Sequence, residues 1–421
     1  MIKRPDGTAD LLPDDLAQWN RVERTVREVF GRYGYLEVRP PLFENTNLFY
    51  KSTGETTDIV EKEMFTVPPR GETSDSYTFR PELTPGAIRA LIEAKSFAQQ
   101  AFWKVFYWGS AFRYERPQKG RLRQFTQFGV EALGSEEPLI DVETIAVFAE
   151  ILKLCGVTRY DVRINTIGCA ACRGAFREKL KGILGPQIAT FCENCRKRLD
   201  RNVFRILDCK IDAEKTAALP PITENVCEAC KAHFAAVQAG LTNSGVAFSV
   251  DPRIVRGLDY YTRTVYEISS PDLGSQSALG GGGRYDGLVE SMGGPKVGGV
   301  GFAAGVERVL IALDAAKVAA SPAALPDFYA IAATPDARAA LFSIVQALRA
   351  KGLSGDLDFE GRSVKAQFRS ANRSGARFAV VVGGEELAKQ VVKVKNMADG
   401  AEQAVPVEEA AALIARGRTT S

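Results

Sequence analysis

The chain has 421 residues, a length that predicts two or three domains. Lys and Arg total 54 against 51 Asp and Glu, so a formal charge of +3 excludes a strongly basic chain but leaves room for local basic patches. No apolar run approaches the ~20 residues that span a bilayer, and no secretory signal is apparent, so we expect a cytoplasmic protein with no membrane partner. The single histidine, His233, nearly excludes catalysis by a histidine base.

The N-terminal hundred residues predict a helix followed by short strands. Apolar residues recur at helical spacing over residues 13–33, and a strand-like run at 35–39 then stops at a Pro-Pro pair. Such a unit suits a subunit contact as well as ordinary packing on its own core. Glu82 and Thr84 lie on a turn between a strand and a helix, where ligand groups are common, although a helix cap explains them equally well.

Residues 102–134 predict an antiparallel hairpin, because two aromatic-rich runs flank a loop with Pro and Gly. Side chains alternate between the faces of a strand, so Phe125, Gln127 and Glu131 share one face of the second run. Gly129 lies on the same face and lets another group approach the backbone. These residues, with an arginine at the end of the first run, favour a site for an anionic, aromatic ligand over a sheet edge with a polar ladder.

The composition changes between residues 168 and 244, a mainly helical region that holds seven of the eight cysteines. Six of them form three CxxC pairs, each able to offer two thiolates to one tetrahedral ion: Cys169, Cys172, Cys192, Cys195, Cys227 and Cys230. The first two pairs are nineteen residues apart, a spacing typical of structural zinc. The remaining Cys209, Cys227, Cys230 and His233 could then form a second site. Two alternatives stay open: a site shared by the second and third pairs, and reduced thiols without metal.

Polar groups crowd residues 252–270, which the pattern predicts to be partly a buried strand. Arg256, Tyr260 and Tyr261 belong to this stretch. Buried polar groups need partners, so we favour a binding site here over a plain strand.

A run of four glycines at 280–283 precedes Tyr285 and permits close approach of the backbone to a ligand. The run fits neither the dinucleotide-binding nor the P-loop spacing. A more specific feature is Arg308, which lies in an otherwise apolar helix after a Gly-rich strand. An arginine in such a place is costly unless it meets an anion.

A small-residue linker at 315–326 indicates a domain boundary. Strands and helices alternate after it, which predicts a small α/β domain with a partly parallel sheet. Its basic residues recur at three- and four-residue steps and predict one helical stripe, either solvated or in contact with a phosphate backbone: Arg362, Lys365, Arg369, Arg373 and Arg377.

Taken together, five stretches resemble the bacterial histidyl-tRNA synthetases, which are class II aminoacyl-tRNA synthetases. The helix–strand ending at the Pro-Pro pair resembles the first motif of the class, FRYERPQKGRLRQFTQFGVE the second and GFAAGVERVLIAL the third. RGLDYYTRTVYE and LGGGGRYDGL are similar to stretches particular to this family. The resemblance covers nearly the whole chain.

The resemblance implies an α+β fold in three parts. A class II antiparallel catalytic sheet flanked by helices would comprise residues 1–166 and 248–318. A Cys-rich, mainly helical insertion domain would comprise 167–247, and an α/β anticodon-binding domain 326–421. The N-terminal helix–strand would form a homodimer interface.

The resemblance also implies the reaction. ATP with Mg²⁺ activates histidine to histidyl-adenylate and pyrophosphate, and the histidyl group then passes to the 3' end of its tRNA. Arg113 would clamp the α-phosphate, Arg308 the γ-phosphate, and Arg256 the histidine carboxylate and α-phosphate, tasks that suit a planar guanidinium. The implied ATP site comprises Arg113, Glu115, Arg121, Phe125 and Arg308.

Glu82 and Thr84 would hold the substrate ammonium with help from Gln127, while Glu131 and Tyr261 would read the two imidazole nitrogens. The whole implied histidine site comprises Glu82, Leu83, Thr84, Gln127, Glu131, Tyr260, Tyr261 and Tyr285. Leu83 departs from the glycine that many bacterial members carry there. In the hairpin loop, Gln118 and Arg123 would contact the acceptor end of the tRNA.

Two rival interpretations stand beside this one. The regulatory subunit of ATP phosphoribosyltransferase shares the catalytic fold, but it lacks the C-terminal α/β domain and has no use for the phosphate-clamping arginines. Another class II synthetase is disfavoured by the two family-specific stretches.

Overall fold

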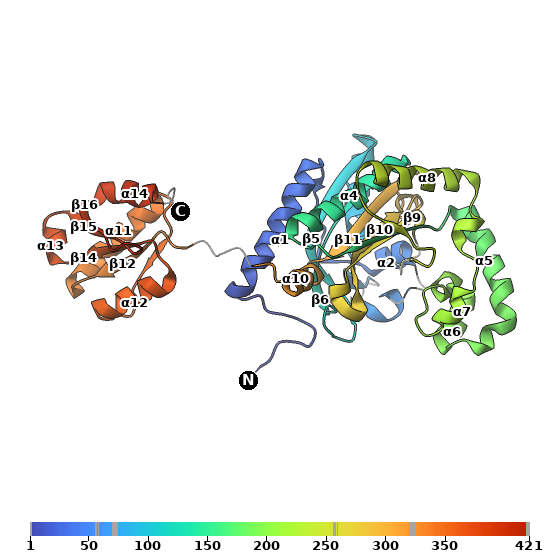
Figure 1. Ribbon diagram of the computed structural model, residues 1–421, viewed down its shortest axis with the longest axis horizontal. Coiled ribbons are helices and arrows are strands. Elements are labelled where there is room, and N and C mark those ends of the chain that lie inside the picture. The colour runs from blue at the N-terminus through green and yellow to red at the C-terminus, as the bar shows by residue number, and fades with distance from the viewer. Residues whose placement is uncertain are drawn as a thin grey trace. The chain divides into compact units, whose positions relative to one another are not determined.

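The computed structural model describes residues 2–54, 57, 59–69, 75–255, 258, 260–319 and 325–417. Arg256 therefore lies outside the described residues. The chain divides into two units, Met1–Ala320 and Ser321–Ser421 (Figure 1), and the division falls within the small-residue linker. In the described part of the chain, no helix has the length and apolarity needed to cross a membrane.

The first unit is built on an eight-stranded sheet in the order β1-β5-β6-β11-β10-β9-β7-β8. All neighbours from β5 to β7 are antiparallel, and only the short outer strands β1 and β8 are parallel to their partners. The mixed sheet with flanking helices confirms the predicted α+β class. The strands are β1 Leu36–Glu37, β5 Trp103–Phe112, β6 Gln124–Leu133, β7 Asp161–Thr166, β8 Ser249–Val250, β9 Thr262–Ser269, β10 Ala278–Arg284 and β11 Gly299–Gly305.

Four helices cover one face of this sheet and share a hydrophobic core with it: α1 Pro13–Arg32, α4 Pro138–Cys155, α8 Glu228–Asn243 and α10 Val306–Ala315. The capping box of α1 is closed by Asp15, whose carboxylate accepts the Leu12 N–H at 3.0 Å. Phe148 of α4 stacks on Phe302 of β11 with ring centres 4.6 Å apart. Because this face is filled by apolar side chains, the opposite face is left for polar groups.

A small three-stranded sheet and two helices lie on the other side of β5: β2 Phe43–Asn45, β3 Phe65–Val67, β4 Tyr77–Phe79, α2 Thr46–Thr53 and α3 Thr84–Glu93. Arg80, just after β4, ties this layer to the main sheet. Its guanidinium donates to the carbonyl oxygens of Ser110 at 2.7 Å and Pro40 at 2.6 Å. These bonds hold the turn that carries Glu82 close to β5. Shorter elements of this unit are η1 Ile59–Glu63, η2 Ser96–Ala98, η6 Pro271–Gln276 and α9 Leu288–Ser291.

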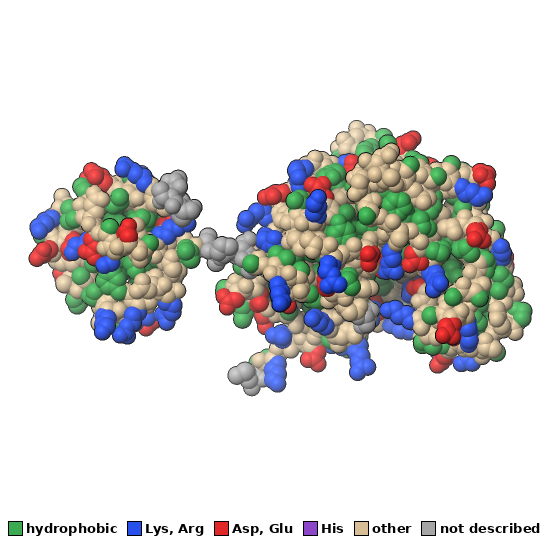
Figure 2. All heavy atoms as spheres, in the orientation of Figure 1, with side chains coloured by type: hydrophobic (Ala, Val, Ile, Leu, Met, Phe, Trp, Pro, Cys, Tyr) green, Lys and Arg blue, Asp and Glu red, His purple; other side chains and the backbone are tan. Residues whose placement is uncertain are grey.

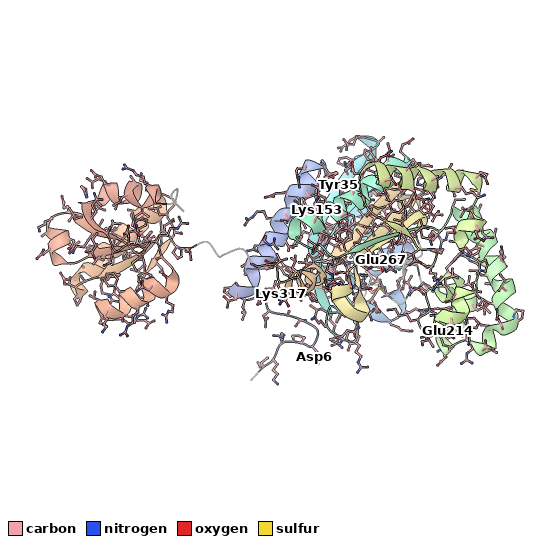
Figure 3. The ribbon with its side chains drawn as sticks, in the orientation of Figure 1. Asp6, Tyr35, Lys153, Glu214, Glu267 and Lys317 are labelled. Atoms are coloured by element: carbon pink, nitrogen blue, oxygen red, sulfur yellow. The ribbon has the colours of Figure 1, made fainter. Side chains whose placement is uncertain are left out.

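The Cys-rich segment consists of short helices beside the sheet, drawn in green in Figure 1. Figure 3 labels Glu214 on α7 of this segment and Glu267 on β9 of the sheet. The last helix of the Cys-rich segment, α8, packs on α4 and so joins the core of the first unit. The other elements are α5 Ala170–Leu184, η3 Gly185–Thr190, α6 Glu193–Arg201, η4 Val203–Ile206, α7 Ala213–Ala217 and η5 Ile222–Asn225.

The second unit is a five-stranded sheet in the order β13-β12-β14-β15-β16, in which β13, β12 and β14 are parallel and the last two pairs antiparallel. This confirms the predicted partly parallel α/β domain. The strands are β12 Phe328–Ala332, β13 Gly355–Leu357, β14 Phe378–Val382, β15 Val391–Asn396 and β16 Glu402–Pro406. The helical elements are η7 Pro335–Ala337, α11 Arg338–Ala350, α12 Val364–Ser374, α13 Gly384–Ala388 and α14 Val407–Arg416.

The predicted basic stripe is shorter than expected. Only Lys365, Arg369 and Arg373 lie on α12, over which Figure 2 shows Lys and Arg side chains gathered. Arg362 precedes the helix and pairs with the carboxylate of Asp358. The prediction of a five-residue helical stripe is therefore wrong, because α12 begins at Val364 and ends at Ser374.

Candidate active site

The polar face of the main sheet lines a cavity together with the turn before α3. The predicted alternation along β6 is confirmed, since Phe125, Gln127 and Glu131 line this cavity whereas Phe128 and Val130 are in the core. Two groups approach the backbone at Gly129: the carbonyl oxygen of Phe302 on β11 and the hydroxyl of Tyr107, directly opposite on β5. A Cβ atom on Gly129 would lie 2.6 Å from that hydroxyl oxygen.

Glu131 lies at the bottom of the cavity and is only 1% exposed. One carboxylate oxygen accepts hydrogen bonds from the hydroxyls of Thr84 at 2.6 Å and Tyr107 at 3.0 Å, and the other from the hydroxyl of Tyr285. Burial raises the pKa of Glu131 to about 7, although the three hydroxyl donors act in the opposite direction. A buried carboxylate near neutrality is a candidate group for binding a cationic or N–H-donating ligand.

A second buried carboxylate, Glu82, lies at the same end of the cavity and is 3% exposed. It accepts hydrogen bonds from the hydroxyls of Thr53 and Tyr260, both at 3.2 Å. Burial raises the pKa of Tyr260 well above its ordinary range, so the phenol stays a donor at neutral pH. Gln127 completes this end with a side-chain oxygen that is buried and has no hydrogen-bond partner among the described residues. A ligand amine would satisfy that oxygen.

The other end of the cavity is cationic, with Arg113, Arg121 and Arg308 in its wall. Arg308 donates to the carbonyl oxygens of Gly120 at 3.0 Å and Ala278 at 2.8 Å. Burial lowers its pKa, and the charges of Arg113 and Arg121 lower it further. Arg121 pairs with Glu115 at 2.6 Å.

Within the described residues, neither Arg113 nor Arg308 has an ion pair. Arg113 donates to the carbonyl oxygen of Pro81 at 2.9 Å and lies over the ring of Phe125, 5.3 Å from its centre. Half-buried guanidinium groups that repel one another and have no ion-pair partner are stabilised by an anion. The cavity thus has an anion-binding end beside an aromatic ring and a cation-binding end with two carboxylates.

The structure brings most of the predicted site residues into this one cavity: Glu82, Thr84, Arg113, Glu115, Arg121, Phe125, Gln127, Glu131, Tyr260, Tyr261, Tyr285 and Arg308. Leu83 does not line it, because its side chain packs into the core with Ala87 and Tyr107. Gln118 is exposed in the hairpin loop. Arg123 lies over the ring of Tyr114 at 4.4 Å and donates to a backbone oxygen of the N-terminal segment.

Sequence reasoning missed several residues that support the site. Tyr107 cannot be recognised from its own strand, because the only indication of it in the sequence is Gly129 on the neighbouring strand β6. Gly301 of β11 is required because a Cβ atom there would collide with the Glu131 carboxylate. Glu307 accepts the Thr126 N–H at 2.8 Å and so fixes the start of α10, next to Arg308, to β6. Burial raises the pKa of Glu307 to about 7.

The predicted joining of the first two CxxC pairs is wrong. Among the described residues, two groups of ligand atoms lie within 4.8 Å of one another: Cys169, Cys172, Cys227 and Cys230 form one, and Cys192, Cys195, Cys209 and Asp212 the other. The first and third pairs meet because α5 and α8 begin side by side. His233 belongs to neither group, since its imidazole lies 3.3 Å from the carboxylate of Asp141.

A largely antiparallel sheet that carries such a cavity is typical of the class II aminoacyl-tRNA synthetases. The family model described as histidyl-tRNA synthetase matches residues 7–172 and 194–309, and that of the anticodon binding domain matches 328–416. The chain belongs to the histidyl-tRNA synthetase family.

Individual relatives agree. A histidine–tRNA ligase of Moorella thermoacetica is 45% identical over 409 residues, which cover 97% of this chain and 96% of that protein. One of Solidesulfovibrio magneticus is 46% identical, over 96% of this chain and 95% of that protein. The structure resembles apo S. aureus histidyl-tRNA synthetase with a TM-score of 0.82 and 35% identity, over 99% of both chains.

Proposed function

We propose that the chain is a histidine–tRNA ligase, which activates histidine with ATP and transfers it to the 3' end of the histidine tRNA. The observation that carries the proposal is the polarity of the cavity: unpaired arginines at one end and two buried carboxylates at the other. An amino acid bound with its amine among the carboxylates directs its own carboxylate toward the arginines. Since that carboxylate attacks the α-phosphate, the protein needs no nucleophile, and catalysis is positioning and charge stabilisation.

At the anionic end, Arg113 binds the α-phosphate and Arg308 the γ-phosphate of ATP. Both guanidinium groups keep free N–H donors after their bonds to backbone oxygens, and a phosphate offers the oxygens that a planar fork requires. The adenine stacks on Phe125, with Glu115 and Arg121 beside the nucleotide. Magnesium arrives as the metal of the nucleotide, and Arg256 supplements it at the α-phosphate and the histidine carboxylate.

At the other end, Glu82 and Gln127 hold the ammonium group of histidine. Tyr260 and Tyr285 line the pocket through their hydrogen bonds to Glu82 and Glu131. Thr84 donates to Glu131 and keeps its lone pairs for the ammonium. Glu131 accepts from one imidazole nitrogen and Tyr261 meets the other. A site built for both nitrogens rejects apolar amino acids of similar size, because they would leave a buried carboxylate unpaired.

The tRNA meets the chain at two places under this proposal. The loop with Gln118 and Arg123 contacts the acceptor end, and α12 of the second unit offers its basic face to the anticodon arm. Residues 167–247 act as an insertion domain of the catalytic part (1–166 and 248–318), and residues 326–421 read the anticodon.

A homodimer forms through the N-terminal helix–strand unit. Leu36 on its strand, and three apolar side chains on or just before the strands of the small three-stranded sheet, are at least two-fifths exposed in the single chain, which supports an interface: Leu42, Phe43 and Tyr77.

Histidine-dependent ATP–pyrophosphate exchange, followed by charging of histidine tRNA, tests the function. Both activities are expected. The rival is a regulatory role, favoured only by fold similarity to a B. halodurans protein titled ATP phosphoribosyltransferase regulatory subunit/histidyl-tRNA synthetase, at 20% identity and a TM-score of 0.64. Loss of both activities in a folded chain that still binds histidine would favour that role.

A further inference from the structure

Each of the three CxxC pairs straddles the first turn of a helix. Cys169, Cys192 and Cys227 occupy the positions just before α5, α6 and α8, and each partner cysteine lies three residues later, in the first turn. Residues at these two positions lie at the same end of the helix, so both thiols face one point in space. That end also carries the positive end of the helix dipole, which stabilises thiolates.

The first cluster joins two such helix starts. The Sγ atoms of Cys169 and Cys172 are 3.5 Å apart, and the backbone N–H of Cys227 donates to the Sγ of Cys172 at 3.1 Å. With Cys230, four sulfur atoms lie within 4.8 Å of one another. Four sulfurs bound tetrahedrally at about 2.3 Å from zinc lie about 3.8 Å apart, so the thiols need only small adjustments to bind zinc.

The second cluster joins the start of α6 to the loop before α7. The Sγ atoms of Cys192 and Cys209 are 3.8 Å apart, and the carboxylate of Asp212 lies 3.7 Å from the Sγ of Cys209. Asp212 is 6% exposed and accepts the Cys192 backbone N–H at 2.9 Å. With the sulfur of Cys195, this cluster offers three sulfurs and one carboxylate oxygen, a ligand set that zinc accepts.

The two clusters cross-link parts of this segment that are distant in sequence. Residues 167–247 form five- to sixteen-residue helices joined by 3₁₀ turns, and their buried apolar side chains belong to a core cluster that the cysteines themselves join. A bound metal would add cross-links to this hydrophobic packing. The first cluster lies where the segment leaves β7 and where it returns through α8, and the second lies in its middle.

A series of contacts links the first cluster to the pocket. It fixes the start of α8, and α8 presents His233 to Asp141. Asp141 binds Arg284 at 3.1 Å, and both side chains are fully buried. The residue after Arg284 is Tyr285, which donates to Glu131.

We propose that the Cys-rich segment binds two structural zinc ions, one through Cys169, Cys172, Cys227 and Cys230 and one through Cys192, Cys195, Cys209 and Asp212. Neither set has an open coordination position, and neither depends on the proposed ligase function.

The test is the zinc content of the full chain, purified with any affinity tag removed and analysed by inductively coupled plasma mass spectrometry. Two zinc ions per chain are expected. The double variants C169S/C172S and C192S/C195S should each keep one, and the matched control C155S should keep two, because Cys155 is buried in α4 outside both clusters. H233A should also keep two, whereas loss of a zinc ion there would overturn the assignment.

A second measurement uses the unmodified chain and therefore does not depend on whether the variants fold. Replacement of zinc by Co²⁺ should give sulfur-to-metal charge-transfer absorption, and titration of the thiols with an organomercurial should release two equivalents of zinc to a chromophoric chelator. Less than half an equivalent, or intramolecular disulfides seen as a mass loss in the intact protein, would overturn the proposal. Release of one equivalent only, with C192S/C195S unchanged in metal content, would overturn the second site.

Discussion

Replacement of Glu131 by glutamine should raise the stability of the folded chain above pH 7 and lower its activity. The carboxylate is buried, and its pKa is raised from an ordinary value of 4.5 to about 7. Because the folded-state pKa is the higher one, the contribution of this group to stability is complete below about 4.5 and is lost as the pH rises to about 7. At 1.36 kcal/mol per pH unit, the ionised carboxylate costs the folded chain roughly 3 kcal/mol at pH 8.

The side-chain amide of glutamine is neutral at every pH and does not carry this free-energy cost of ionisation. E131Q should therefore melt close to the wild type near pH 5 and at a higher temperature above pH 7, with the difference growing between these values. Melting temperatures measured from pH 5 to pH 8 in both proteins test this. The other buried carboxylate with a pKa of about 7, Glu307, titrates in both proteins and cancels in the difference.

The same variant should lose activity. A charge-assisted hydrogen bond contributes about 1.5–3 kcal/mol and a neutral one about 0.5–1.5 kcal/mol, so the replacement forfeits about 1–1.5 kcal/mol, a roughly tenfold lower kcat/KM for histidine in ATP–pyrophosphate exchange. The matched control E136Q, which changes a carboxylate that is 66% exposed, should alter neither quantity. Near-normal exchange by E131Q, or a melting difference that is the same at pH 5 and pH 8, would refute the reasoning.

Three further variants address other parts of the chain. G301A should abolish histidine-dependent exchange, since its Cβ atom would collide with the Glu131 carboxylate and with the backbone oxygen of Val130 on the paired strand; full activity would show that the close approach of β11 to Glu131 is not needed. R308K should raise the KM for ATP roughly tenfold or more with little change in histidine binding, because an ammonium cannot replace the guanidinium fork; an effect on histidine alone would contradict this. The double change K365E/R369E on α12 should lower tRNA charging at least tenfold while leaving exchange intact; equal losses in both assays would count against a tRNA contact.

Several features of this protein follow from the sequence alone because they depend on local geometry. The common face of Phe125, Gln127 and Glu131 is a consequence of side-chain alternation along any strand, and the structure agrees. The helix over residues 13–33 and the strand at 378–382 likewise follow from apolar spacing. Arg308 in an apolar helix indicated an anion site because the cost of burying a charge does not depend on the fold.

Other features needed the tertiary structure, since they depend on which distant segments meet. Tyr107 reaches Glu131 only because β5 pairs with β6 in the register that places it opposite Gly129. The CxxC motifs look alike in sequence, and only the meeting of the first turns of α5 and α8 decides which pairs share a site. A local pattern determines which way a side chain points from its own element, but its partner comes from chain segments many residues away, and packing alone brings them together.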